Sequence, residues 1–231
     1  MSEIKLHTSV DSYPKSHSTS GEPYLTPLFI NNEFVKSSTK EWYDIHDPAT
    51  NKVISRVPQT TDDELNKTIE LAHTTFKKWK TTSIIKRQQL LFKYVELIKQ
   101  NHDRIASVIV AEQGKTFDDA KGDVLRGLQV AEYATSITTE LQGVQLEVAT
   151  DMETLMIREP LGVIAAICPF NFPAMIPLWT IPLAIATGNT CVLKPSERDP
   201  GAAVILAQLA KEAGVPPGVV NLVHGKVPTV N

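Results

Sequence analysis

The sequence predicts an α/β fold built on part of a doubly wound, Rossmann-like parallel sheet, and three observations support this. Residues 161–193 carry no charge. Within that stretch an apolar run, a proline-containing segment of helix length and a second apolar run follow one another. A helical pattern from about 200 and an apolar run at 219–223 then complete a β-α-β-α-β order, which is that of a mononucleotide-binding half-domain.

The charge-free stretch also suggests a membrane span, which needs about 20 apolar residues. Four prolines interrupt it, and one proline inside a helix costs about 3 kcal/mol, so we predict no membrane partner. The prolines are Pro169, Pro173, Pro177 and Pro182. We instead predict a strand at 162–167 covered on both faces, a loop at 168–172, a helix from 173 to about 187, and a strand at 190–193.

Composition narrows the class of protein. The chain has 231 residues, 42% hydrophobic and 21% charged, with a net charge of −3, which is ordinary for a globular protein and gives no sign of a nucleic-acid partner. Two cysteines without a secretory signal indicate an intracellular protein with reduced thiols. The six histidines have no metal-ligand spacing, so we predict no metal site.

We divide the chain into four parts. Residues 1–26, rich in Ser, Thr and Pro, are predicted to be a flexible leader. This leader has no Arg and contains acidic residues, so it does not decide between a mitochondrial and a cytoplasmic location. Residues 27–142 form a β and helical part, 143–159 a bridging hairpin, and 160–231 the β-α-β-α-β part.

The 27–142 part begins with a small β layer and continues with helices. Strands are predicted over 28–35, around the turn Asn31-Asn32, and over 43–46 and 53–57, around a second turn at 47–51. A capping box from Thr61 to Glu64 begins the first helix. A second helix covers about 90–98, a third covers 102–113 and ends at Gly114, and a fourth begins at Thr116.

Apolar periodicity predicts which helix faces are buried. The expected inward residues of the first helix are Leu65, Ile69, Ala72, Phe76 and Trp79. Those of the fourth are Val124, Leu125, Leu128 and Ala131, with Asp123, Arg126 and Glu132 on its outer face. Near the end of the chain, Asp199 is expected to cap a helix that Pro200 begins.

An alternating hairpin over 144–148 and 154–158, turning at Thr150-Asp151, precedes the central stretch. A two-stranded hairpin is marginally stable on its own. We therefore expect it to lie against another surface, in this chain or in a partner.

No dinucleotide fingerprint and no phosphate-loop motif occurs, so a cofactor site must come from side chains at the strand ends. The loops 168–172 and 194–198 follow neighbouring parallel strands and should share one edge. Lys194 and Glu197 could hold the two hydroxyls of a ribose, and Arg198 could lie against the sugar or an adenine. The alternative is a solvated, charged loop.

Three further residues have both a chemical and a structural interpretation. Asn171 could donate its amide to an oxyanion, or bond its own backbone as a turn residue. Cys168 directly follows a strand without a histidine nearby in sequence, which favours packing over nucleophilic attack. Arg126 is, by itself, an ordinary surface charge.

Together these motifs resemble the aldehyde dehydrogenase superfamily over about residues 27–231. The motifs are Pro169-Phe170-Asn171-Phe172-Pro173, Gly188-Asn189, Lys194-Pro195-Ser196-Glu197 and Pro217-Gly218-Val219-Val220-Asn221. Residues 112–116 and 122–127, with Cys168 before the first motif, look most like its methylmalonate-semialdehyde dehydrogenase branch.

The resemblance implies NAD and coenzyme A as cofactor and co-substrate. It implies oxidation of methylmalonate or malonate semialdehyde to propionyl- or acetyl-CoA, in valine and pyrimidine breakdown, by a homo-oligomer. Asn171 becomes the oxyanion donor and Arg126 a clamp for the substrate carboxylate. Lys194 and Glu197 become ribose ligands. Cys168, through its backbone, Phe170 and Arg198 then line the adenosine side.

Members of the family are about twice this length, and their catalytic cysteine, general-base glutamate and glycine-rich turn match positions beyond Asn231. We therefore expect a fragment without the catalytic domain that is inactive alone. The alternative hypothesis is a non-catalytic, nucleotide-binding or regulatory subunit that pairs with a full-length paralogue. A third is a chain without function, because a sheet that stops part-way leaves an edge that invites aggregation.

Overall fold

The computed structural model describes residues 23–230, and it has the predicted α/β architecture. The predicted leader lies outside the described residues as far as residue 22. Its last residues are ordered, because Tyr24–Leu25 forms strand β1, which pairs in parallel with β5, and the Tyr24 side chain is buried. The predicted boundary at residue 26 was therefore too late.

The central sheet has five strands in the order β3-β2-β10-β9-β8. Strands β8, β9 and β10 are parallel, whereas β2 pairs antiparallel with β10 and with β3, so the sheet is mixed. The strands span Leu28–Ile30 (β2), Glu33–Val35 (β3), Val163–Ile167 (β8), Thr190–Lys194 (β9) and Val220–Leu222 (β10). The predicted turn at Asn31-Asn32 is confirmed, and both residues have positive φ.

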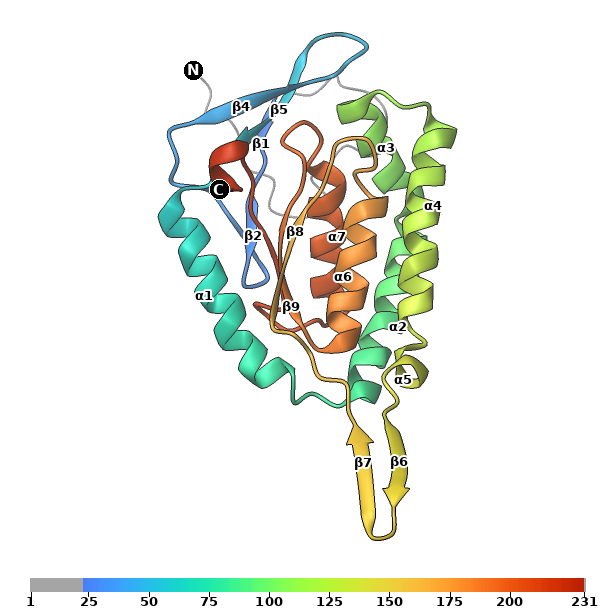
Figure 1. Ribbon diagram of the computed structural model, residues 1–231. Coiled ribbons are helices and arrows are strands. Elements are labelled where there is room, and N and C mark those ends of the chain that lie inside the picture. The colour runs from blue at the N-terminus through green and yellow to red at the C-terminus, as the bar shows by residue number, and fades with distance from the viewer. Residues whose placement is uncertain (1–22, 231) are drawn as a thin grey trace.

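Helices cover both faces of this sheet (Figure 1). Helix α1 packs on one face, and α6 and α7 pack on the other. Helices α2, α3 and α4 form an outer layer against α6 and α7. The helices are α1 (Asp62–Trp79), α2 (Ile84–Gln100), α3 (His102–Gln113), α4 (Phe117–Ala134), α5 (Ile137–Glu140), α6 (Met175–Thr187) and α7 (Gly201–Glu212). In residues 23–230 no helix combines the length and apolar character needed to cross a membrane.

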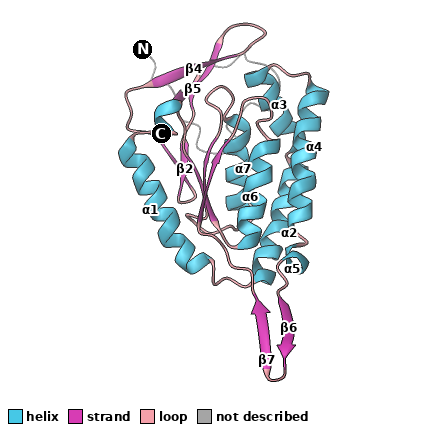
Figure 2. Cartoon of the chain, viewed as in Figure 1, coloured by secondary structure: helices cyan, strands magenta, loops and turns pink. Residues whose placement is uncertain are grey.

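A second, three-stranded sheet lies beside the carboxyl ends of the central strands, at the top of Figure 2. Its order is β1-β5-β4, with β4 at Trp42–His46 and β5 at Val53–Pro58. It packs Ile45, Ile54 and Val57 against Ala111 of α3. The predicted β layer is thus divided, because β2 and β3 join the central sheet instead.

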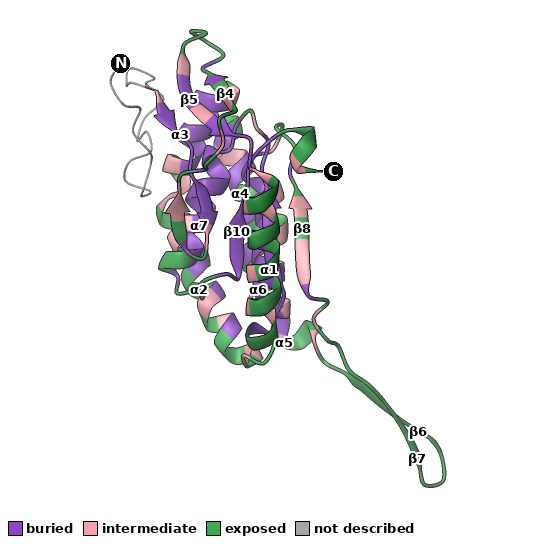
Figure 3. Cartoon of the chain, turned by 90° about the vertical axis from the view of Figure 1, so that its left-hand side faces the viewer, coloured by how far each residue is buried: buried purple, intermediate pink, exposed green. Residues whose placement is uncertain are grey.

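The hairpin of β6 (Val144–Ala149) and β7 (Met152–Met156) projects away from the body (Figure 3). Every residue of both strands is exposed. Strand β7 begins two residues earlier than predicted, after a turn in which Asp151 has positive φ. The hairpin does not lie on any described surface of this chain, so a partner surface for it stays a prediction.

The capping box of α1 is confirmed in both directions. The Thr61 hydroxyl accepts the Glu64 backbone N–H at 3.3 Å, and the Glu64 carboxylate accepts the Thr61 backbone N–H at 3.0 Å. Gly114 and Gly188 end α3 and α6 in the left-handed conformation that glycine adopts without strain. These local signals therefore mark the start of α1 and the ends of α3 and α6.

Five predictions about burial and capping were wrong. Ile69 and Leu125 are 42% and 48% exposed, because each lies at the margin of its helix's apolar face. Asp123, predicted on the outer face of α4, is fully buried. Asp199 makes no cap bond to α7, whose N-cap position is Pro200. Strand β8 is only partly buried: it is an edge strand of the sheet, and Ile167 is 60% exposed.

Helices α4 and α6 pack closely, and this decides where the loop before α6 lies. A Cβ atom on Gly127 of α4 would come within 2.7 Å of Leu178 and within 3.0 Å of the Met175 Cα atom. Small residues recur along this face of α4 at 120, 127, 131 and 134. The start of α6 is therefore held against the middle of α4.

Candidate functional site

The two loops predicted to be neighbours do leave adjacent strands. Ile167 at the end of β8 is in register with Lys194 at the end of β9. The Cys168 backbone N–H donates to the Lys194 carbonyl at 2.9 Å, which extends the pairing by one residue. Because both strands are parallel, loops 168–172 and 194–198 open at the same edge of the sheet.

A cavity of about 420 Å³ lies at this edge. Its lining includes all five residues predicted to face a cofactor: Cys168, Phe170, Lys194, Glu197 and Arg198. A volume of this size is within the range of small-molecule sites, which is about 300–1,000 Å³. Phe170, Glu197 and Arg198 also line an adjoining cavity of about 450 Å³ that reaches Glu112 and Asp199.

Lys194 and Glu197 form the polar side of the cavity. The Lys194 ammonium donates to the carbonyls of Pro195 and Gly225 at 2.9 and 3.0 Å, and lies 3.9 Å from the Glu197 carboxylate. Burial lowers the pKa of Lys194, and Glu197 opposes this. The ammonium is fixed in direction, so one charged donor and one acceptor are presented side by side.

Phe170 and Arg198 form a flat, exposed wall. The Arg198 guanidinium lies 4.9 Å from the centre of the Phe170 ring, which is a cation–π distance. Phe170 is 46% exposed. A planar ring and a planar cation in contact can pack against the flat face of a base or a sugar.

Neither cysteine has the environment of a nucleophile. Burial raises the pKa of both Cys168 and Cys191 to about 12, and the partial opposing effect of Lys194 on Cys168 is smaller. A thiol with such a pKa is protonated near neutral pH and reacts slowly. The sequence-based preference for packing agrees with this environment.

Asn171 and Arg126 lie outside the lining of the 420 Å³ cavity. Asn171 is exposed in the loop between β8 and α6, three residues after Cys168. Arg126 is exposed on α4, one turn after the buried Asp123. The structure brings the five cofactor candidates together at one cavity, and Asn171 and Arg126 are not among its lining residues.

Two buried carboxylates, for which the sequence predicted no structural role, hold the helices that follow this edge. Neither α6 nor α7 has a side-chain cap of its own. Asp123 of α4 accepts the Met175 backbone N–H of α6 at 2.8 Å. Glu112 of α3 accepts the Gly201 backbone N–H of α7 at 2.8 Å and the Tyr24 hydroxyl at 3.3 Å. Each acid thus supplies the cap that the local sequence lacks.

Lys115 contacts both Asp123 and Phe172, which lies next to Asn171 in the loop before α6. Its ammonium lies 3.2 Å from the Asp123 carboxylate and 4.4 Å from the centre of the Phe172 ring. Burial raises the pKa of Asp123, while the Met175 N–H and Lys115 act against the rise. The signal in the sequence was the position of Asp123 between small residues at 120 and 127, which marks a close helix contact.

The buried acids predict a pH-dependent stability. Burial raises the pKa of Glu112 to about 8 and that of its neighbour Asp199 to about 7. Both acids keep a proton in the folded state at pH values where the unfolded chain has lost it. The free energy of unfolding should therefore be highest in mild acid and fall by a few kcal/mol, as an order of magnitude, between pH 5 and 8.

Glu112→Gln tests this, because glutamine keeps an acceptor for Gly201 and cannot ionise. We expect urea unfolding of the variant to show a clearly smaller loss of stability from pH 5 to 8, with Asp199 contributing the remainder. An unchanged pH slope in Glu112→Gln would contradict the assignment.

The fold and the site together define an open α/β sheet with a ligand-sized cavity beyond the carboxyl ends of its parallel strands. The sequence matches the Aldehyde dehydrogenase family over residues 34–231. The chain therefore belongs to the aldehyde dehydrogenase family.

Relatives within the family are similar over nearly the whole chain. A probable methylmalonate-semialdehyde/malonate-semialdehyde dehydrogenase [acylating], mitochondrial, of Aedes aegypti is 54% identical over 218 residues, which is 94% of this chain and 42% of that protein. The Homo sapiens methylmalonate-semialdehyde/malonate-semialdehyde dehydrogenase [acylating], mitochondrial, is 47% identical over 99% of this chain and 43% of its own length. This chain thus spans less than half the length of the curated relatives it matches.

Solved structures agree with this relationship. The crystal structure of a methylmalonate-semialdehyde dehydrogenase from Sinorhizobium meliloti 1021, complexed with NAD, superposes with a TM-score of 0.87 at 38% identity. The similarity covers 90% of this chain and 42% of that one. The chain is therefore homologous to part of an enzyme of the methylmalonate-semialdehyde dehydrogenase type.

Proposed function

We propose that this chain is the nucleotide-facing part of an NAD-dependent, CoA-acylating dehydrogenase that converts methylmalonate or malonate semialdehyde to propionyl- or acetyl-CoA. Valine and pyrimidine breakdown is the expected context. The proposal rests on one observation: a single cavity is lined by Cys168, Phe170, Lys194, Glu197 and Arg198. The homology to acylating relatives supports the choice of substrate and of coenzyme A.

The residues present fit an adenosine moiety. Lys194 offers a fixed donor and Glu197 an acceptor, so the pair can bind two neighbouring ribose hydroxyls. Phe170 and Arg198 provide the flat wall for the base or sugar. The Cys168 backbone N–H is already used in the sheet, which leaves its carbonyl to face the ligand. NAD, when bound, supplies the chemistry of hydride acceptance.

Asn171 and Arg126 are proposed to act on the aldehyde. Asn171 is exposed at the same edge of the sheet, where its amide N–H can donate to an oxyanion. Arg126 is exposed on the helix that packs against α6, and its guanidinium can hold a carboxylate in a bidentate manner. Lys115 and Asp123 position the start of α6, which follows Asn171 by four residues.

Residues 1–231 by themselves are proposed not to turn over. The reaction needs a thiolate to attack the aldehyde. The chain has two cysteines, both buried, and the pKa of each is about 12. An oxyanion donor alone contributes only about 3–4 kcal/mol of barrier lowering.

We expect the purified 231-residue chain to form no NADH above background from malonate semialdehyde, NAD and coenzyme A. Absorbance at the NADH band measures this, with a full-length relative as the positive control. Steady NADH formation by this chain would refute the inactivity proposal. Loss of that activity in Cys168→Ser would then identify Cys168 as the reacting thiol.

The second candidate function is a non-catalytic subunit that binds nucleotide and pairs with a full-length dehydrogenase. One observation favours it: the β6–β7 hairpin extends, fully exposed, away from the described body (Figure 3). Co-purification of a longer dehydrogenase with the tagged chain, lost on deletion of residues 144–156, supports this candidate. Recovery of a homo-oligomer alone would favour the first. Relatives named as mitochondrial suggest that compartment for either role.

A further inference from the structure

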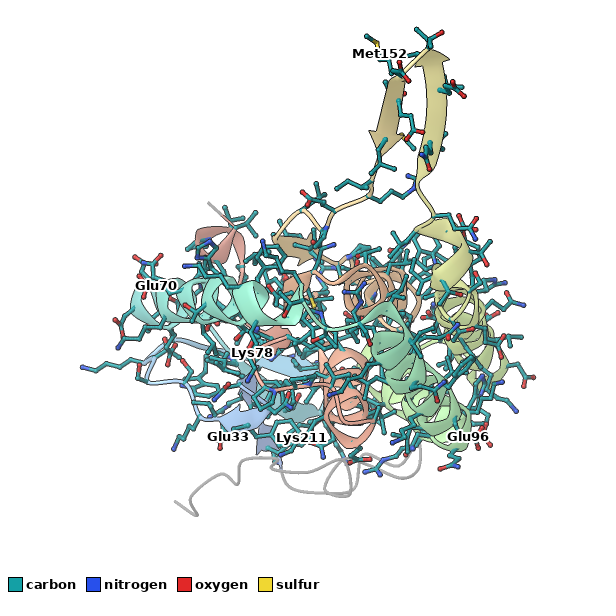
Figure 4. All side chains as sticks on the ribbon, turned by 90° about the horizontal axis from the view of Figure 1, so that it is seen from below. Glu33, Glu70, Lys78, Glu96, Met152 and Lys211 are labelled. Atoms are coloured by element: carbon teal, nitrogen blue, oxygen red, sulfur yellow. The ribbon has the colours of Figure 1, made fainter. Side chains whose placement is uncertain are left out.

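A third cavity lies at the opposite, amino end of the parallel strands. It has a volume of about 500 Å³ and is lined by the end of α1, the start of α2 and the loop that leads into β10. Figure 4 shows the molecule from this end and labels Lys78 on α1. The cavity shares no lining residue with the two at the other edge, so the proposed nucleotide site does not account for it.

The walls of this cavity combine an apolar floor with a cationic rim. Pro216 and Pro217 supply accessible apolar surface, and the buried Trp79 and Val219 lie in the wall behind it. Its charged lining residues are Lys78 and Lys86, with no carboxylate among the described lining. Thr74, Thr75 and Thr82 also line the cavity. Such a surface is complementary to a molecule with an apolar body and a negative end.

Within residues 23–230, neither the lining of this cavity nor the helix ends beside it give Lys78 or Lys86 an acidic partner. The carbonyls of Phe76, Lys78 and Trp79 at the end of α1 already accept bonds from Lys80, Thr81 and Thr82. Lys86 lies in the first turn of α2, where the helix dipole is positive. Neither feature supplies a carboxylate partner to the two ammonium groups.

One donor in the wall has no acceptor. Trp79 is 3% exposed, and its buried indole N–H has no hydrogen-bond partner within the described residues. An unmet buried donor lowers stability, which makes such groups rare in folded proteins. Since the wall also seals this N–H from solvent, the Trp79 indole is a sensitive reporter of any change in the cavity.

We propose that this cavity is a binding site for a small amphipathic organic anion, a carboxylate on an apolar body. Lys78 and Lys86 hold the carboxylate, and the body packs on Pro216 and Pro217, next to the buried Trp79. Because α1 also covers β8, β9 and β10, an occupant here contacts the same helix that covers the strands leading to the nucleotide edge.

The test is a titration of the ¹⁵N-labelled chain followed through its indole N–H signals. The chain has three tryptophans, and the other two are internal controls. Trp42 donates to the Thr39 carbonyl at 3.1 Å, and Trp179 is exposed on α6. Three probes separate the contributions: benzoate has charge and body, benzamide lacks the charge, and inorganic phosphate lacks the body.

Benzoate should shift the Trp79 signal saturably and leave Trp42 and Trp179 in place, and benzamide and phosphate should bind at least about tenfold more weakly. The double variant Lys78→Gln, Lys86→Gln should bind benzoate about tenfold more weakly than the parent chain. Lys77→Gln, one residue away and outside the cavity, should not. An unmoved Trp79 signal, equal binding of benzoate and benzamide, or equal binding of phosphate would overturn the proposal. Sequential NMR assignment identifies the Trp79 signal without a variant that could unfold.

Discussion

Asp123→Ala is expected to lower the free energy of unfolding by about 3–5 kcal/mol, which is typical when one partner of a buried ion pair is removed. The substitution takes away the acceptor of the Met175 N–H and leaves the Lys115 ammonium, whose side chain is 15% exposed, without its carboxylate. It also opens a small cavity between α4 and α6. Urea unfolding followed by circular dichroism measures the change.

Asp123→Asn is the matched variant, since it keeps the shape and one acceptor oxygen and removes the charge. Asp123→Asn should lose clearly less unfolding free energy than Asp123→Ala. Asp119→Ala, an exposed acid on the same helix, should change stability by less than about 1 kcal/mol. If the free energy of unfolding of Asp123→Ala lies within about 1 kcal/mol of that of the parent chain, the Asp123 carboxylate does not anchor α6. It then does not hold the Asn171 loop in place either.

Lys194→Met is expected to weaken NAD binding by about ten- to a hundredfold. Loss of one charged hydrogen bond to the ribose costs about 1.5–3 kcal/mol, and methionine keeps the volume of the lysine stem. Isothermal titration calorimetry with NAD measures the affinity. Since Lys194 also bonds the Pro195 and Gly225 carbonyls, circular dichroism must show an unchanged fold.

Lys211→Met provides the control for charge alone. Lys211 is exposed in the last turn of α7 and lines none of the three cavities described here. NAD affinity should therefore stay within about twofold of the parent chain. If Lys194→Met and Lys211→Met bind NAD equally tightly, Lys194 does not contribute to NAD binding.

Local signals in the sequence account for much of this fold. Glycine at 114 and 188 and the capping box at Thr61 mark helix ends through backbone conformation and hydrogen bonds within a few residues. The apolar runs at β8, β9 and β10 indicate parallel strands, and parallel strands place their carboxyl ends at one edge. This rule alone predicts that residues 168–170 and 194–198 lie next to each other, and they line one cavity.

The remaining features depend on contacts between distant segments, which periodicity does not show. Asp123 was assigned to the outer face because a charged residue on an amphipathic helix usually meets water. It is buried because α6 lacks its own cap and approaches α4 closely at Gly127. Glu112 is buried for the same reason at α7. Strand β8 has the apolar composition of a central strand, yet it lies at the edge of the sheet.

The central claim is that the edge beyond β8 and β9 binds NAD, and backbone amide NMR of the ¹⁵N-labelled chain tests it most directly. On addition of NAD, the largest shifts should fall on Cys168, Phe170, Glu197 and Arg198, with smaller ones at Lys226, which lines the same cavity. Shifts absent from these loops, or largest along the β6–β7 hairpin or at the end of α1, would contradict the account.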